Sequence, residues 1–154
     1  MIKNKIIIGS ANVNNSYGLK KNKILGSDFK KLLNYASRKK LKIIDTSPNY
    51  ANAEKVIGSI KKNFKIITKI PKIPNTIKNH NIEDWILKIV NNSQKNLRSK
   101  KIYGILIQDA QTLLTYRAEK IYNTIKKLQT SGVIKNIGIS IYDFKILAPI
   151  IKKN

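Results

Sequence analysis

Residues 42–58 read KIIDTSPNYANAEKVIG, and this stretch decides the fold that we expect. A short apolar run ends in Asp45, a Ser-Pro turn leads to Tyr50, and a helix-forming segment follows. Asp45 is one of only eight acids in a chain with 31 basic residues. A carboxylate at the end of a buried strand costs free energy unless it is paired or hydrogen-bonded. Asp45 therefore marks either a functional site or a loop cap through Thr46 and Ser47, because Asp-Thr-Ser also suits a turn.

Strand and helix signals alternate along the whole chain. Apolar runs predict five strands, at residues 5–9, 41–45, 64–70, 102–107 and 137–141. A polar loop is expected at 10–26, followed by a helix that Ser27 caps. Periodic apolar residues and end signals predict four further segments. They are a short helix at 53–60, a helix from the cap Asn81 to Leu97, a helix from about Arg117 to just before Gly132, and a short helix or turn at 144–151.

The strands are near-continuous apolar runs, which is typical of parallel strands buried on both faces. Helical crossovers, which parallel strands require, connect them. The chain has no Gly-rich dinucleotide fingerprint, so we favour a barrel-type sheet over a doubly wound one. We expect an α/β fold, an incomplete (β/α)8 TIM barrel with about five β/α units and a parallel sheet, forming a single domain over residues 1–154.

Composition limits the classes of partner. The chain has 42% hydrophobic residues and no cysteine, and no stretch approaches the ~20 apolar residues of a membrane span. We expect a cytoplasmic protein without a membrane contact or a metal site. The net charge is +23, but the lysines are spread along the chain beside abundant Ile and Asn. This pattern indicates compositional bias, so we expect no specific nucleic-acid partner and only weak, salt-sensitive association.

Polar residues collect at or just after the carboxyl ends of the predicted strands, which share one face of a barrel. They are Asp45, Lys69, Gln108, Asp109 and Ser140, with Tyr50 in the loop after the second strand. An acid, a lysine and a tyrosine that converge there suit proton donation to a carbonyl, because an ammonium stabilises tyrosinate and a carboxylate holds the ammonium. Plainer interpretations stay open: Tyr50 as a packed loop residue, Lys69 as an edge-strand charge, and Gln108 and Asp109 as solvated loop residues. His80, the one histidine, is expected to be a surface loop residue.

The chain resembles the aldo-keto reductases, NADP-dependent oxidoreductases built on a (β/α)8 barrel. The resemblance lies in IIIGSANVNNSYGL at the first strand, IIDTSPNYANAEKVIG at the second, FKIITKIP at the third, YGILIQDA at the fourth and GVIKNIGISIYD at the fifth. It implies hydride transfer between NADPH and a small carbonyl substrate, namely an aldehyde, a ketone or a sugar. By resemblance, Asp45, Tyr50 and Lys69 match the catalytic acid, the proton-donating tyrosine and the helper lysine.

Two positions depart from the family pattern. Gln108 stands where the family has a histidine that orients the substrate carbonyl; an amide can still donate a hydrogen bond, but a histidine proton relay would be lost. Ser140 matches the serine that holds the nicotinamide carboxamide, and Ile141 replaces the asparagine that often follows it.

The chain is also short for the resemblance. A full barrel takes ~250 residues, and the family grips the cofactor's phosphate and adenosine mainly with loops after the last strands. NADPH binding is therefore expected to be impaired in this truncated form. Five strands leave two open sheet edges, which favour pairing with other chains. The alternative to an enzyme is a non-catalytic half-barrel, either a fragment or an assembly partner that associates with itself or with a complementing C-terminal half.

Overall fold

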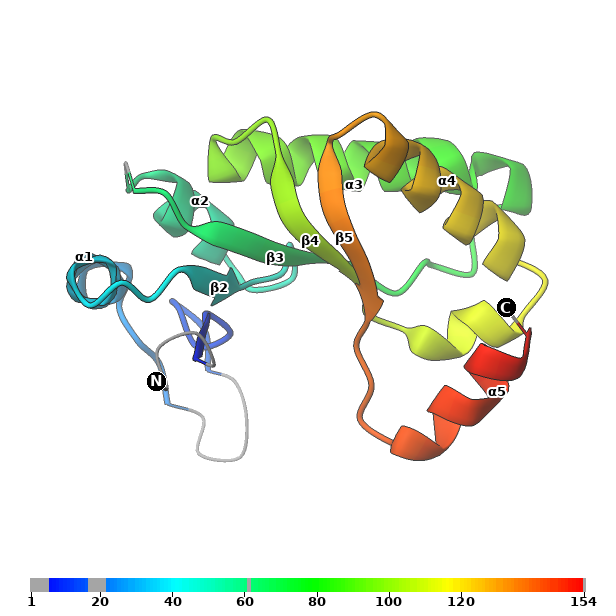
Figure 1. Cartoon of the computed structure of the whole chain (residues 1–154), viewed down its shortest axis with the longest axis horizontal. Helices are drawn as coiled ribbons and strands as arrows, with labels where there is room; N and C mark the ends of the chain where they lie inside the picture. The colour runs from blue at the N-terminus through cyan, green and yellow to red at the C-terminus, as the bar shows by residue number, and fades with distance from the viewer. Residues whose placement is uncertain (1–5, 17–21, 61, 154) are drawn as a thin grey trace.

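The structure, a computed structural model, describes residues 6–16, 22–60 and 62–153. Its centre is one five-stranded sheet in the order β1-β2-β3-β4-β5 (Figure 1). The strands are β1 Ile7–Gly9, β2 Ile43–Asp45, β3 Lys65–Ile70, β4 Ile102–Ile107 and β5 Ile134–Ile139. Every pairing is parallel, and each strand pairs with the next one along the chain. The strand order therefore never reverses, as it would in a doubly wound sheet. The predicted partial TIM barrel is confirmed.

Helices connect the strands. They are α1 Gly26–Arg38, α2 Ala53–Gly58, α3 Ile82–Leu97, α4 Ala118–Thr130 and α5 Leu147–Lys153, with short 3-10 turns η2 Asn79–Asn81, η3 Ala110–Leu114 and η4 Phe144–Ile146. Figure 1 shows α2, α3 and α4 on one face of the sheet, which we call the outer face; the other is the inner face. Within the described residues, no helix has both the length and the apolar character needed to cross a membrane.

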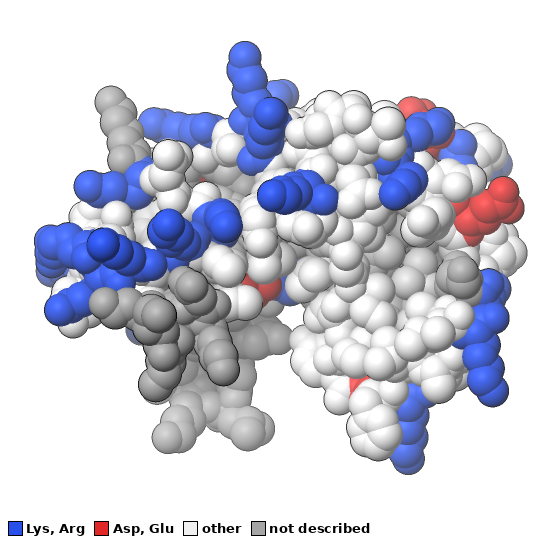
Figure 2. Space-filling model, in the orientation of Figure 1, with Lys and Arg blue, Asp and Glu red and all other residues white. Residues whose placement is uncertain are grey.

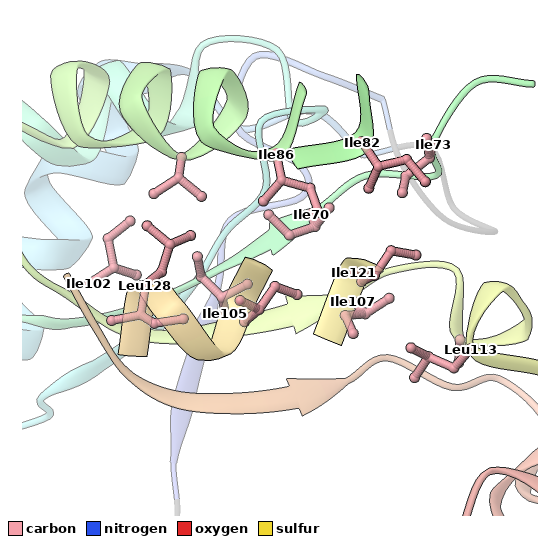
Figure 3. Packing of buried hydrophobic residues seen from close by; sticks show 14 of the residues in the cluster. Ile70, Ile73, Ile82, Ile86, Ile102, Ile105, Ile107, Leu113, Ile121 and Leu128 are labelled. Atoms are coloured by element: carbon pink, nitrogen blue, oxygen red, sulfur yellow. The ribbon is translucent and has the colours of Figure 1, made fainter. Parts of the chain in front are cut away.

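Isoleucine fills the space between the sheet and these helices. Successive strand residues point to opposite faces, so Ile105 and Ile107 of β4 both reach the outer face and are buried there. They pack in one cluster with Ile86 of α3 and Ile121 of α4 (Figure 3). Burying one such side chain contributes about 1.5–3 kcal/mol. The β-branched shape of isoleucine also suits a strand, so one residue type supplies both the strands and the core.

One helix-cap prediction was wrong, and a second was right in position but not in its hydrogen bond. Ser27 does not cap α1, because the helix already begins at Gly26 and its N-cap position is Leu25, without a side-chain hydrogen bond. Asn81 does occupy the N-cap position of α3, but its side chain makes no capping bond either. Residues 79–81, which precede α3, form the 3-10 turn η2. Neither N-cap residue bonds its own helix through its side chain, and at α1 the Gly26 N–H donates instead to the side-chain oxygen of Asn14 at 3.0 Å.

The fifth strand lies earlier than predicted, at Ile134–Ile139 instead of 137–141. Lys135 and Asn136 are exposed in it, which broke the apolar run on which the prediction depended. They remain in the strand because, among the described strands, β5 pairs only with β4 and so lies at an edge of the sheet. Lys5, at the start of the predicted first strand, lies outside the described residues, as do residues 17–21 of the predicted first loop.

Glu83 joins α3 to α4. Its two carboxylate oxygens accept hydrogen bonds from Lys120 and Lys127, each at 2.8 Å. These two bonds lower the pKa of Glu83 from its ordinary value of 4.5 to about 2. Because the folded pKa lies below the unfolded one, this contribution to stability is fully present above pH 4.5 and is lost as the pH falls toward 2.

We predict that Glu83→Gln lowers stability at pH 7 and flattens the loss of stability between pH 4.5 and 2, because the variant has no carboxylate to protonate there. Urea denaturation at stepped pH measures both effects. Glu119→Gln, which removes an exposed acid from α4 without breaking either pair, is the matched control. Parallel acid limbs for wild type and Glu83→Gln would contradict the prediction.

Candidate active site

The carboxyl ends of β2 and β3 bring an acid and a lysine together. Asp45 is the last residue of β2 and pairs in register with Ile67 of β3. Lys69 lies two residues beyond Ile67 on the same strand. The Lys69 Nζ donates to both Asp45 carboxylate oxygens at 2.7 Å and to the Thr46 carbonyl at 2.9 Å. All three ammonium protons are therefore used. The Lys69 side chain is only 6% exposed, against 30% for Asp45, so the ammonium is the buried member of the pair.

This pairing excludes one plain interpretation of Lys69. It is not an edge-strand charge, because β3 is the central strand of the sheet. A buried ammonium persists only when it is paired and hydrogen-bonded, and Asp45 supplies that partner. The free-energy cost of placing the Asp45 carboxylate at the end of a buried strand is therefore offset by its ion pair with Lys69, and not by a loop cap.

Tyr50 completes the group. The Lys69 Nζ lies 5.1 Å from the centre of its ring. The Tyr50 N–H donates to the Ser47 carbonyl at 3.0 Å, and the Tyr50 carbonyl accepts from the N–H of Ala53 at the start of α2. These backbone bonds fix the turn that carries the phenol between β2 and α2. A carboxylate, an ammonium and a phenol thus lie on one rim, by which we mean the edge formed by the carboxyl ends of the strands. This is where we expected them to converge.

Gln108 joins this rim from β4. Its N–H donates to the Ile70 carbonyl at 3.0 Å, which extends the β3–β4 ladder by one residue. Its side-chain Oε1 lies 3.5 Å from the hydroxyl of Ser47, which itself accepts the Asn49 N–H at 3.2 Å. Ser47 is buried. The Ser47 hydroxyl therefore accepts one hydrogen bond from Asn49 and donates its one proton to the amide oxygen of Gln108.

Ser140 extends the rim to β5. Ser140 directly follows the last residue of β5. Its N–H donates to the Ile107 carbonyl at 2.9 Å. Ser140 and Gln108 line one hollow of about 670 Å3, together with Asp109 and residues of η3 and η4. Asp109 also lies 3.8 Å from the Lys72 Nζ. His80 is exposed in η2, as expected of a surface residue.

Sequence reasoning missed two residues that support the rim. Ser10 is buried, and its N–H and hydroxyl both donate to the Asp45 carbonyl, at 3.0 and 2.9 Å. The buried carboxylate of Glu54 in α2 accepts from Thr68 of β3 at 2.8 Å and from Asn96 of α3 at 3.3 Å. Both lie within the quoted motifs, but a serine and a helical glutamate carry no sequence signal of burial. Among the described residues, no cluster of three or more His, Cys, Asp or Glu side chains could hold a metal ion.

Comparison with known proteins decides the family. The model of the aldo/keto reductase family matches residues 5–154. The chain belongs to this family. No curated protein matches the sequence.

Solved aldo-keto reductases share the fold at low identity. One from Pseudomonas aeruginosa has a TM-score of 0.68 and 20% identity, over 87% of this chain and 54% of its own. A thermostable one, in complex with the inhibitor epalrestat, has a TM-score of 0.69 and 20% identity, over 96% and 53%. One from Klebsiella pneumoniae, in complex with NADPH, has a TM-score of 0.67 and 18% identity, over 95% and 49%. The chain thus spans about half the length of these aldo-keto reductases.

We predict that Lys69→Met costs on the order of 3 kcal/mol of unfolding free energy, because it leaves the Asp45 carboxylate without its buried partner. Lys65→Met, on the same strand but exposed, should cost less than about 0.5 kcal/mol.

A double-mutant cycle in urea gives the decisive measurement. If the two side chains interact, Asp45→Asn combined with Lys69→Met costs less than the sum of the single changes. Additive costs would show that the ion pair contributes nothing to stability.

Proposed function

We propose that this aldo/keto reductase chain carries the proton-transfer machinery of an NADPH-dependent carbonyl reductase, with Tyr50 as proton donor. The observation that supports this most strongly is the Lys69 ammonium, salt-bridged to Asp45 and 5.1 Å from the Tyr50 ring. The substrate would be an aldehyde, a ketone or a sugar, and the reaction could also run in reverse. A cytoplasmic location suits this activity and is part of the proposal.

Lys69 acts on Tyr50 through its charge. Its three protons are engaged by Asp45 and Thr46, so the ammonium is held in place as a fixed positive charge. When Tyr50 gives its proton to the carbonyl oxygen, the phenol becomes a phenolate. A cation held close to it in a partly buried site stabilises that negative charge without reorganising. Asp45 holds the lysine in this orientation through two of its hydrogen bonds.

Gln108 takes the part of orienting the carbonyl. The Ser47 hydroxyl occupies its amide oxygen, which leaves the amide N–H groups for a substrate oxygen. Ser47 is thus a positioning residue for Gln108. An amide donates hydrogen bonds but does not change its protonation at neutral pH, so Tyr50 alone supplies the proton in this scheme.

The nicotinamide end of the cofactor suits the residues present. The hydroxyl of Ser140 and the amide of Gln108 line one hollow, and a hydroxyl beside an amide matches the donors and acceptors of a carboxamide. Ser140 would hold that carboxamide, and bound NADPH would supply the hydride. The Klebsiella pneumoniae relative in complex with NADPH supports this choice of cofactor.

A second candidate is a non-catalytic half-barrel that assembles with another copy or with a complementing C-terminal half. The sheet supports it, because β1 and β5 each pair with one neighbour among the described strands. Ile7 of β1 is 52% exposed. Beyond β5, the chain exposes several large apolar side chains, Ile141, Tyr142, Phe144, Leu147 and Ile151. Open edges beside exposed apolar residues favour strand addition.

We predict that Tyr50→Phe lowers NADPH-dependent turnover of a carbonyl panel by roughly 10²–10⁴-fold, the usual contribution of a positioned acid. The phenylalanine ring keeps the apolar contact, so NADPH affinity by fluorescence titration should not change. Tyr122→Phe, on the exposed side of α4, is the matched control. Unchanged turnover in Tyr50→Phe would reject Tyr50 as the donor.

Light scattering combined with NADPH titration separates the two candidates. The half-barrel candidate predicts oligomers without cofactor binding, and Tyr142→Ser with Phe144→Ser should then return the chain toward monomers. The reductase candidate predicts saturable NADPH binding. A monomer that binds NADPH tightly would eliminate the half-barrel candidate.

A further inference from the structure

All the acids of this chain lie at one end of the sheet, whereas cations occur at both ends. All eight acids fall in the described part of the chain. Asp45, Asp109 and Asp143 follow the carboxyl ends of strands, and the other five lie in the first turns of helices. In a parallel sheet with helical crossovers, these first turns lie at the end where the strands finish. The opposite end, where the strands begin, therefore carries no acid.

The end where the strands begin carries exposed cations at four consecutive strands. We call this set the basic rim: Lys42 before β2, Lys62 and Lys65 at β3, Arg98 and Lys101 before β4, and Lys135 in β5. Neighbouring strands lie ~4.8 Å apart, so the rim is a row of charges about 14 Å long. Figure 2 shows Lys and Arg crowding the upper and left part of the molecule, where the strands of Figure 1 begin.

A hollow of about 680 Å3 lies within the basic rim. Its floor is apolar, with Ile57, Phe64, Ile66 and Leu97. Its border is polar, with Lys62, Asn63, Arg98 and Ser99. It belongs to the end of the sheet opposite Tyr50, so the reductase site does not use it. An apolar floor that includes an aromatic ring, bordered by cations, suits a planar base that carries a phosphate.

We propose that the basic rim binds single-stranded nucleic acid without sequence preference, with phosphates along the cations and one base in the hollow against Phe64. Compositional bias toward lysine explains the number of cations, but it does not explain why every acid lies at the other end. A flat membrane surface cannot enter the hollow. Duplex bases are stacked and paired, so they cannot enter it without unpairing.

The test is fluorescence anisotropy of the full chain with labelled oligo-dT of about 15 nucleotides, at salt concentrations from about 50 to 200 mM. We expect binding at low salt. The double variant Lys62→Gln/Arg98→Gln should reduce the slope of log affinity against log salt by about 1.4, because each single-strand phosphate that the variant leaves without a cation accounts for about 0.7. The control Lys145→Gln/Lys152→Gln removes the same charge from the η4–α5 segment, far from the rim, and should leave the slope unchanged.

A third variant tests the base contact. Phe64→Leu keeps the floor apolar and should weaken oligo-dT binding about tenfold, in the range expected for one stacked base. Circular dichroism melts confirm that each variant is folded. Equal losses of affinity in the rim and control variants would overturn the proposal in favour of net charge alone. Stronger binding to a duplex of the same length or to phosphatidylserine vesicles than to oligo-dT, or full strength in Phe64→Leu, would also overturn it.

Discussion

The ion pair between Asp45 and Lys69 is the constraint on which the candidate active site depends. It holds the buried Lys69 ammonium against the inner face of the sheet, where this charge could not persist without a partner. The central strand β3 is held on both faces at this point. Lys69 reaches inward to Asp45, while the adjacent Thr68 points outward and bonds the buried Glu54 of α2. The loop that carries Tyr50 runs from Asp45 to α2, so both of its ends are fixed to β3.

The rim requires only neighbouring strands. Asp45, Lys69 and Gln108 come from β2, β3 and β4, and the chain pairs these three consecutively. Their meeting therefore does not depend on closing the barrel. Closure concerns the two open edges at β1 and β5. A chain that spans about half the length of these solved aldo-keto reductases thus brings the acid, the lysine and the tyrosine together.

The sequence predicted those parts that follow from local pattern. The strands are runs of isoleucine, and an acid directly after such a run is conspicuous, which is why Asp45 could be singled out. The helical faces of α3 and α4 follow a 3.6-residue period. The exposed Lys135 and Asn136 obscured β5, because an edge strand does not need to be apolar on both faces.

Other features depend on contacts between distant residues. Ser47 and Gln108 are 61 positions apart, and neither residue signals the other in one sequence. The absence of acids from the basic rim was equally hidden, because acids and lysines are interspersed along the chain. Only the parallel stacking of the units collects the acids at one end of the sheet.

That stacking gives the molecule a direction. With every acid at the finish of the strands and the basic rim at their start, we expect the net cation to carry an electric dipole along the strand axis. We expect an extended anion to be steered toward the strand starts, which leaves the end that carries Tyr50 facing solvent.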